Sequence, residues 1–418
     1  SETRQPPSDL VEQSHSLIGW AYFRMQQFET AVLYFENVLS SSQNEELRAN
    51  ALLKIADAYY SLGQYQEAIE YYTRLLSEYP ESNEAIDGEY NRLLTYVQAG
   101  EQEEYVLAAE QFLQAHLPDD PSVANTTQNS EKTFREHPQT PAVLYQFGEF
   151  SLEQQQFEKA ISLFLRLLSL YPEHELADES LYGVGWCYFK AQQYPEAMHA
   201  FEEFLSRFPE SEHVPDAYYG LGTASFMQHN YAAAITQYTL ILKKFPDYSL
   251  NDRVMLNLGT SLINTGIFDE AVEILQQSLD RYPQQPFLSE VNLKTGYALQ
   301  KLGEYEQAIP HLGQAVAGSD PNIAAEAQFR IGECYAHLQE RDKAIVDYLK
   351  VVYLYPEQTQ WVSQAQFRAA NMYEEIGKEE EAMLLYQKIL DTSQNAALIA
   401  EAQQRIIELN RELPSSRE

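Results

Sequence analysis

A 37-residue internal period constrains the fold of this chain more than any other feature of its sequence. Five alanines keep this step, and five glycines keep it twelve residues earlier: Ala160, Ala197, Ala234, Ala271 and Ala308 follow Gly148, Gly185, Gly222, Gly259 and Gly296. A period of this length, held over most of 418 residues, is typical of a solenoid of stacked units rather than of one compact core.

Each period reads as a helical hairpin. In residues 179–209 apolar side chains recur at helical spacing in two runs, which are separated near Gln192 and stopped by Pro209. Gly185 and Ala197 are small where two helices must approach closely. One hairpin cannot bury its apolar face alone, so neighbouring hairpins must stack. The sequence therefore predicts an all-α chain of about ten hairpins.

The period also predicts a domain organisation, because two segments depart from it. Between Ala68 and Ala160 the chain has 18 residues more than two periods, and the excess is rich in Pro, Asn, Ser and Thr. This segment is either a hinge or partner loop, or a decayed repeat. The predicted parts are a disordered start (1–9), an N-terminal block (10–116), a linker or decayed repeat (117–140), a C-terminal block (141–394), a capping helix (395–413) and a disordered tail (414–418).

The recurring Gly, Tyr, Ala, Phe and Pro frame resembles the tetratricopeptide repeat, and the resemblance covers nearly the whole chain. It implies a right-handed α-α superhelix. The family repeat has 34 residues. The additional residues here follow the proline, because Ala160 to Pro172 is 12 residues but Pro172 to Gly185 is 13. This longer turn, as in 79–82, looks like the bacterial envelope branch, which includes the periplasmic Tol–Pal-associated protein and outer-membrane assembly lipoproteins. The resemblance implies a periplasmic or outer-membrane-associated location, with a cytoplasmic one as the alternative.

The charge of the chain narrows the classes of partner. It carries 62 acidic and 28 basic side chains, for a net charge of −34. Nucleic acid and anionic membrane surfaces need clustered Lys and Arg, so neither is expected as a partner. No run approaches the roughly 18 apolar residues that span a bilayer. A basic or amphipathic protein partner is compatible with the charge, although solubility of a long exposed solenoid is its more usual explanation.

Catalytic and metal-binding patterns are not found in the sequence. The nine histidines lack metal-ligand spacing, and His174 has no second histidine four residues on. Gly220 and Gly222 lie inside a first helix without a preceding strand, so close packing explains them better than dinucleotide binding. Cys187 and Cys334 stand four repeats apart, too far to form a disulfide. We expect no enzymatic activity, cofactor or metal.

The family resemblance implies a concave groove lined by the first helices. The position after each repeat glycine and those three and four further on face this groove; they include Arg24, Asp57, Thr223, Glu333 and His337. Large apolar or aromatic side chains there are typical of partner anchors, unless they pack against a neighbouring helix. The best candidates are Trp20, Phe23, Tyr60, Trp186, Phe189, Lys190, Phe226, Met227 and Tyr297.

A carboxylate clamp of the co-chaperone type is not expected in this groove. The corresponding positions hold Tyr145, Tyr182, Tyr219, Leu256 and Leu293, which cannot supply the charge. The sequence thus favours a non-catalytic scaffold or adaptor that binds a protein segment in its groove. Two alternatives are an assembly subunit that uses its convex face or array ends, and a regulatory region of a longer protein.

Overall fold

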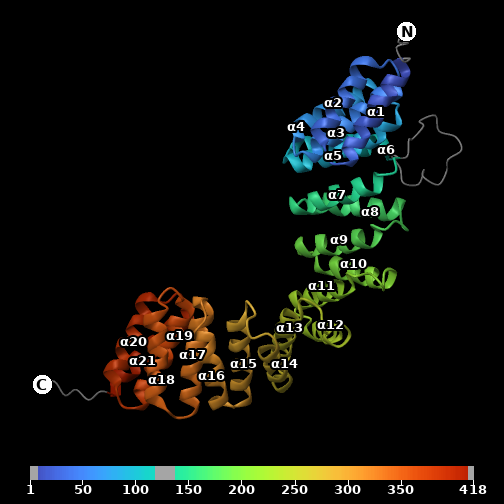
Figure 1. Cartoon of the computed structure of the whole chain (residues 1–418). Coiled ribbons are helices and arrows are strands. Elements are labelled where there is room, and N and C mark those ends of the chain that lie inside the picture. The colour runs from blue at the N-terminus through green and yellow to red at the C-terminus, as the bar shows by residue number, and fades with distance from the viewer. Residues whose placement is uncertain (1–7, 118–136, 413–418) are drawn as a thin grey trace, which may run out of the picture. The chain divides into compact units, whose positions relative to one another are not determined.

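The computed structural model describes residues 8–117 and 137–412, in which 21 helices and their turns form two compact units, Ser1–Gln193 and Tyr194–Glu418 (Figure 1). The first unit contains α1 (Ser8–Arg24), α2 (Phe28–Ser41), α3 (Glu45–Ser61), α4 (Tyr65–Glu78), α5 (Asn83–Ala99), α6 (Gln102–His116), α7 (Thr140–Glu153), α8 (Phe157–Leu170) and α9 (Ala177–Lys190). The second contains α10 (Tyr194–Arg207), α11 (Val214–Met227), α12 (Tyr231–Lys244), α13 (Asn251–Asn264), α14 (Phe268–Arg281), α15 (Leu288–Leu302), α16 (Tyr305–Val316), α17 (Pro321–His337), α18 (Arg341–Leu354), α19 (Thr359–Glu375), α20 (Glu379–Thr392) and α21 (Ala396–Glu412).

Within each unit every helix packs on the helices before and after it in the chain. Contacts also join first helices of successive hairpins, such as α1 with α3 and α17 with α19. A hairpin therefore contacts only its neighbours, which is the packing of a repeat array. The predicted all-α superhelix of ten hairpins and a terminal helix is confirmed, with α21 as that helix.

The repeat glycines are small because an aromatic or leucine side chain from the second helix lies against them. A Cβ atom added at Gly148 would lie 2.5 Å from the ring of Phe164, and one at Gly222 would lie 2.8 Å from the ring of Tyr238. The predicted packing role of these glycines is confirmed. The alanines that follow twelve residues later, such as Ala160, are fully buried for the same reason.

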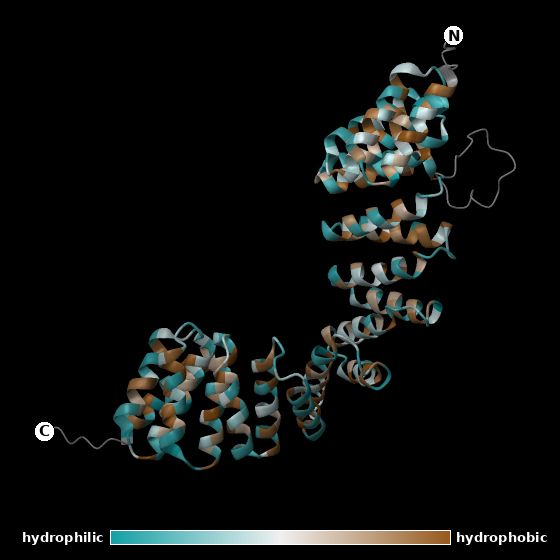
Figure 2. Ribbon diagram, viewed as in Figure 1, coloured by the Kyte–Doolittle hydropathy of each residue, from teal (hydrophilic) through white to brown (hydrophobic). Residues whose placement is uncertain are grey.

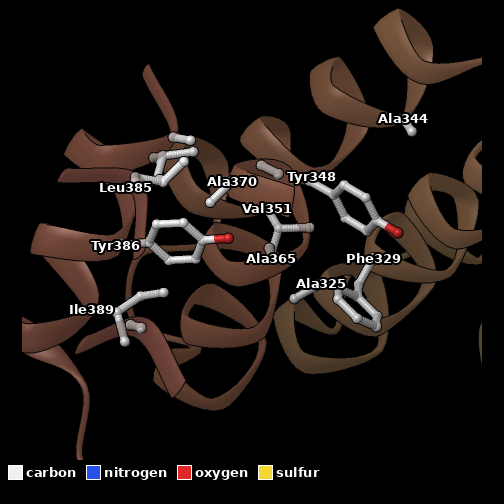
Figure 3. Close-up of a cluster of buried hydrophobic side chains, with 14 residues drawn as sticks. Ala325, Phe329, Ala344, Tyr348, Val351, Ala365, Ala370, Leu385, Tyr386 and Ile389 are labelled. Carbon is white, nitrogen blue, oxygen red and sulfur yellow. The ribbon is translucent and has the colours of Figure 1, made fainter. Parts of the chain in front are cut away.

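Hydrophobic and hydrophilic positions alternate along the helices, as expected when one face of each helix is buried (Figure 2). Figure 3 shows the core at the end of the array, where side chains of five successive helices, α17 to α21, meet. Tyr348 and Tyr386 lie among small residues such as Ala325 and Ala370. This core is thus filled by large aromatic rings and small alanines, which are the residue types that recur in each repeat of the sequence.

The turn inside each hairpin contains one residue with a positive φ. In five turns this residue is glycine, including Gly63 with φ 73°, and in the other five it is glutamine or histidine, including Gln155 with φ 59°. Only glycine adopts this left-handed conformation without steric strain. The ten turns therefore share one backbone geometry but not one residue type.

Both cysteines are buried and unpaired, as the sequence predicts. Cys187 lies in α9 of the first unit and Cys334 in α17 of the second. Burial raises the pKa of each thiol to about 12. The thiolate, which is the reactive form, is therefore scarce at neutral pH.

The hairpin of α5 and α6 is the least regular copy of the repeat. Tyr105 replaces its packing alanine and is buried against Phe147 and Phe150 of α7, with ring centroids 5.8 and 5.0 Å away. Most of the predicted linker 117–140 lies outside the described residues. The last residue of that predicted linker, Thr140, is the first residue of α7. The predicted disordered tail, 414–418, and all but two residues of the predicted disordered start also lie outside them. The predicted block boundaries stay a prediction.

Candidate functional site

A pocket of about 240 Å³ lies across three successive first helices of the first unit. We call it the groove pocket; it is lined by Phe23 of α1, Asp57, Tyr60 and Ser61 of α3, Tyr72 of α4, and Asn91 and Leu94 of α5. Three residues predicted to face the groove, Phe23, Asp57 and Tyr60, thus come together around one cavity.

The floor of the groove pocket is a satisfied polar network. The Asp57 carboxylate accepts hydrogen bonds from the Tyr72 hydroxyl at 2.7 Å and the Asn91 amide at 3.2 Å, and an ion pair with Lys54 at 2.8 Å occupies its other oxygen. Burial, followed by the charge and hydrogen bond of Asp57, raises the pKa of Tyr72 far above its ordinary value, so the hydroxyl stays protonated and donates.

The walls of the groove pocket are aromatic and aliphatic. Phe23 packs edge-on against Phe28 with ring centroids 5.3 Å apart, and Lys54 Nζ lies 5.7 Å from the Phe23 ring centroid. Tyr60 is half-buried beside Tyr65. Because Asp57 already has its partners, the open space favours an apolar side chain over a second cation.

Buried tyrosine hydroxyls are a feature that the sequence reasoning missed. Tyr72, Tyr238 and Tyr386 each follow the packing alanine of a second helix by four residues and reach a polar residue on a first helix. Tyr238 contacts the Thr223 hydroxyl at 3.2 Å and accepts a hydrogen bond from Asn257 at 3.4 Å, while Tyr386 donates to Asn371 at 2.6 Å. The presence of Tyr rather than Phe at this position could have predicted these hydrogen bonds from the sequence.

Trp186 and Phe189 form the second aromatic group predicted from the sequence. Both are half-buried in α9, and Trp186 packs edge-on against Phe189 and Tyr182 with ring centroids 5.4 and 6.1 Å apart. Lys190 follows them and is exposed. The structure thus places these residues together on one helix, in the same unit as the groove pocket.

The other candidates are dispersed. Trp20 is 49% exposed with the Arg24 guanidinium 5.0 Å from its ring centroid, and Met227 is 47% exposed. Phe226 is half-buried and packs edge-on against Tyr231, with ring centroids 5.4 Å apart.

Three side chains of the second unit that are predicted to face the groove already contact other side chains of the same chain. Tyr297 lies under the Arg330 guanidinium, which is 4.1 Å from its ring centroid. Glu333 accepts a hydrogen bond from Gln300 at 3.0 Å, and His337 stacks on Tyr305 with centroids 4.7 Å apart. These side chains have to leave existing contacts before they can bind a partner.

Residues 8–117 and 137–412 contain neither a metal-ligand cluster nor a helix that could span a membrane. No group of three or more His, Cys, Asp or Glu in these ranges could hold a metal ion. None of their helices is long and apolar enough to cross a membrane.

The stacked helical hairpins are those of a tetratricopeptide-type solenoid, and family models agree. Tetratricopeptide repeat models match residues 12–45, 50–82, 253–284, 293–359 and 364–395. A model described as an outer membrane lipoprotein matches residues 137–247. The chain therefore contains tetratricopeptide repeats, and part of it is similar to an outer membrane lipoprotein family. A search of curated proteins finds no significant match.

Solved structures share the fold at low sequence identity. The C-terminal part of a tetratricopeptide repeat protein from Cytophaga hutchinsonii is 16% identical, covers 61% of this chain and 98% of its own, and has a TM-score of 0.51. A tetratricopeptide repeat protein from Parabacteroides merdae is 14% identical over 64% of this chain and 99% of its own, with a TM-score of 0.44. Yeast Tom70 is 15% identical over 98% of both chains, with a TM-score of 0.37. The first of these similarities supports the fold alone.

Proposed function

We propose that this protein is a non-catalytic adaptor that holds a segment of another protein in its first-helix groove, with the groove pocket as the main anchor site. The observation that carries this proposal is the meeting of Phe23, Asp57 and Tyr60 from successive repeats around one cavity. Stacked hairpins of this type form extended surfaces that suit protein–protein interaction.

The groove pocket favours a partner segment with one apolar anchor residue. Its walls are Phe23, Tyr60 and Leu94, and aromatic pockets that desolvate an anchor supply most of the energy of many interfaces. The net charge of −34 attracts basic residues on either side of that anchor and accelerates association. A basic, amphipathic segment therefore fits both the apolar walls of the pocket and the negative electrostatic potential of the chain.

Site-specific crosslinking followed by affinity measurement tests this proposal. A photo-crosslinking amino acid at Ser61, which is exposed on the pocket rim, identifies the segment, and the same label at the exposed Gln277 in the second unit is the control. We expect Phe23→Ala and Tyr60→Ala to weaken binding of the identified segment by about 10-fold or more each. Gln277→Ala should leave it unchanged. Equal binding by all variants would reject the groove pocket.

Trp186 and Phe189 are proposed as a second anchor for the same segment. Their alanine variants should weaken partner binding without loss of helicity, measured by circular dichroism beside the affinity. Retained binding in the double variant would remove α9 from the interface. Lys190 is proposed to lie at its rim, where Lys190→Ala should change mainly the salt dependence of association.

The remaining candidates are proposed as weaker contacts. Trp20 and Met227 are the most exposed of them, whereas Phe226 and Tyr297 already have neighbours within the chain. An assembly subunit is the second candidate function, because Tyr353 and Leu354 of α18 and Leu384 of α20 are each more than 60% exposed. Loss of a complex on Leu384→Lys, with groove binding intact, would favour that function.

A location in the bacterial envelope is proposed on the similarity of residues 137–247 to an outer membrane lipoprotein family. The test is fractionation of cells that express the native gene, followed by detection of this chain in periplasmic, outer-membrane and cytoplasmic fractions. Recovery in the cytoplasm alone would reject the envelope location and leave the groove proposal untouched.

A further inference from the structure

A second pocket of the first unit, which we call the Arg92 pocket, has a volume of about 340 Å³ and shares no residue with the groove pocket. It lies between the end of α4, the first half of α5 and the end of α6. Its polar lining is Glu89, Arg92, His116 and His137, and its apolar lining includes Leu76, Ala85 and Ile86.

Arg92 occupies a position that most other repeats fill with a buried apolar residue. It follows Ile55 by 37 residues, and the equivalent Val184 and Leu258 are also buried. The Nε atom of Arg92 is shielded from solvent and has no hydrogen-bond partner in the described part of the chain, and Arg92 forms no ion pair there. Shielding a guanidinium nitrogen without an acceptor costs free energy, so an arginine in this state points to a binding partner outside the chain.

A neighbouring arginine shows what a satisfied guanidinium looks like in this fold. Arg48 of α3 is also half-buried, yet it donates to the Tyr79 hydroxyl at 2.6 Å and to the carbonyls of Leu39 and Ser42 at 2.5 and 3.3 Å. Acidic residues outnumber basic ones by 62 to 28, so the lack of a partner for Arg92 does not reflect a shortage of carboxylates.

Two histidines contact the carboxylate of the pocket lining, Glu89, and the backbone of α5. Glu89 lies three residues before Arg92 on α5, but its carboxylate contacts His116 Nε2 at 2.9 Å instead. His137 Nε2 donates to the Ile86 carbonyl at 2.8 Å, and its Nδ1 accepts from the Gln139 amide at 3.0 Å. Both nitrogens of His137 are therefore used, while burial lowers its pKa and keeps the ring neutral. Among the charged residues that line the pocket, Arg92 is the one whose charge has no partner in the described part of the chain.

We propose that the Arg92 pocket binds a carboxylate on a small apolar body, with the Arg92 guanidinium as its charge partner. A guanidinium and a carboxylate form paired, charge-assisted hydrogen bonds, which the apolar wall strengthens by excluding water. A phosphate dianion fits less well, because Glu89 already places a negative charge in the lining. The carboxylate comes either from a free small acid or from an acidic side chain of a partner protein.

The test is a titration of the full chain, labelled with ¹⁵N-histidine, followed by NMR. The probes are isovalerate and N-acetyl-glutamate N-methylamide, each with its neutral amide counterpart. We expect saturable shifts with an acid, binding at least about 10-fold weaker for its amide, and a similar loss on Arg92→Gln. Preference for isovalerate indicates a free acid, and preference for the glutamate derivative indicates a protein side chain.

Arg74→Gln is the matched control, because the Arg74 side chain of α4 is half-buried and pairs with Glu78 outside the pocket. It should bind the acid as the unchanged chain does. Arg92→Lys keeps the positive charge but not the paired geometry, so it should lie between the unchanged chain and Arg92→Gln. The proposal is overturned by equal binding of acid and amide, by full binding in Arg92→Gln, or by no saturable shift with either acid.

A second pair of variants separates positioning from folding. If His116 holds Glu89 away from Arg92, His116→Ala frees Glu89 to pair with Arg92 and weakens acid binding by about 10-fold. The double variant His116→Ala/Glu89→Gln should then recover binding, which simple damage to the fold would not allow. Failure of the double variant to recover, with helicity intact, would overturn this role of His116.

Discussion

Two hairpins of the first unit carry an acidic residue at the same repeat position: Asp57 in the hairpin of α3 and α4, and Glu149 in the hairpin of α7 and α8. The two hairpins differ in the aromatic residue that the second helix supplies, which is Tyr72 in one and Phe164 in the other. Asp57 accepts a hydrogen bond from the Tyr72 hydroxyl, whereas Glu149 makes no hydrogen bond with the described residues. Burial, followed by the charges of Glu153 and Glu179, raises the pKa of Glu149. The Tyr72 hydroxyl is thus one of three partners, with Asn91 and Lys54, that satisfy the Asp57 carboxylate, and Phe164 can supply no such partner to Glu149.

Removal of that hydroxyl should have the largest effect. Tyr72→Phe removes one of the two hydrogen bonds that Asp57 Oδ1 accepts and leaves the bond from Asn91 in place, so we expect the free energy of unfolding to fall by about 1–3 kcal/mol. Denaturant unfolding measures this change. Tyr353→Phe, in which the ring is exposed, is the control and should be neutral. An unchanged midpoint in Tyr72→Phe would mean that the hydroxyl does not hold Asp57.

The turns of the same two hairpins give the next contrast. Gly63 joins α3 to α4 with φ 73° and has open space around its missing Cβ. Gly63→Ala therefore isolates backbone strain, and we expect a loss of about 1 kcal/mol in the same unfolding measurement. A gain in stability would show that the turn tolerates a side chain in this conformation.

The reverse change in the other turn should be smaller and of opposite sign. Gln155 joins α7 to α8 with φ 59°, so Gln155→Gly relieves strain but adds freedom to the unfolded chain. The two effects partly cancel, and we expect a net gain of about 0.5 kcal/mol. A loss in the unfolding free energy would contradict this balance.

The smallest expected effect is the pH dependence of Glu149. Because its pKa is higher in the folded chain than in the unfolded chain, its ionisation opposes folding. The penalty is absent below the unfolded pKa of about 4.3 and is complete above the folded pKa. Glu149→Gln should therefore stabilise the chain by a fraction of a kcal/mol at pH 7 and by nothing near pH 3.5. Equal stabilisation at both pH values would assign the effect to packing instead.

The period predicted the fold because it repeats a packing requirement. Gly148 must be small where Phe164 packs, and the same pairing recurs between Gly222 and Tyr238, so spacing alone located the hairpins. The groove pocket was predicted only in part. Phe23 and Tyr60 follow the repeat glycine or its equivalent at the expected distance. Tyr72 comes from a second helix, which the rule for groove positions did not include.

Arg92 was missed for a different reason. Its copy of the repeat is irregular, with Tyr105 in place of the alanine, so the apolar position that Arg92 occupies was not aligned with Ile55. The pairing of Glu89 with His116 joins α5 to the end of α6, and nothing in the spacing of either helix indicates it. Side-chain partners between helices depend on rotamers and packing that a period does not encode.

The two buried thiols give the chain a pair of internal reporters. Each unit holds one cysteine in its interior, so a thiol-reactive dye labels Cys187 or Cys334 only when the surrounding hairpins separate. The two labelling rates, resolved by peptide mapping, measure how often each unit opens under native conditions. A partner that clamps only the first unit would slow the labelling of Cys187 and leave the labelling of Cys334 as it was.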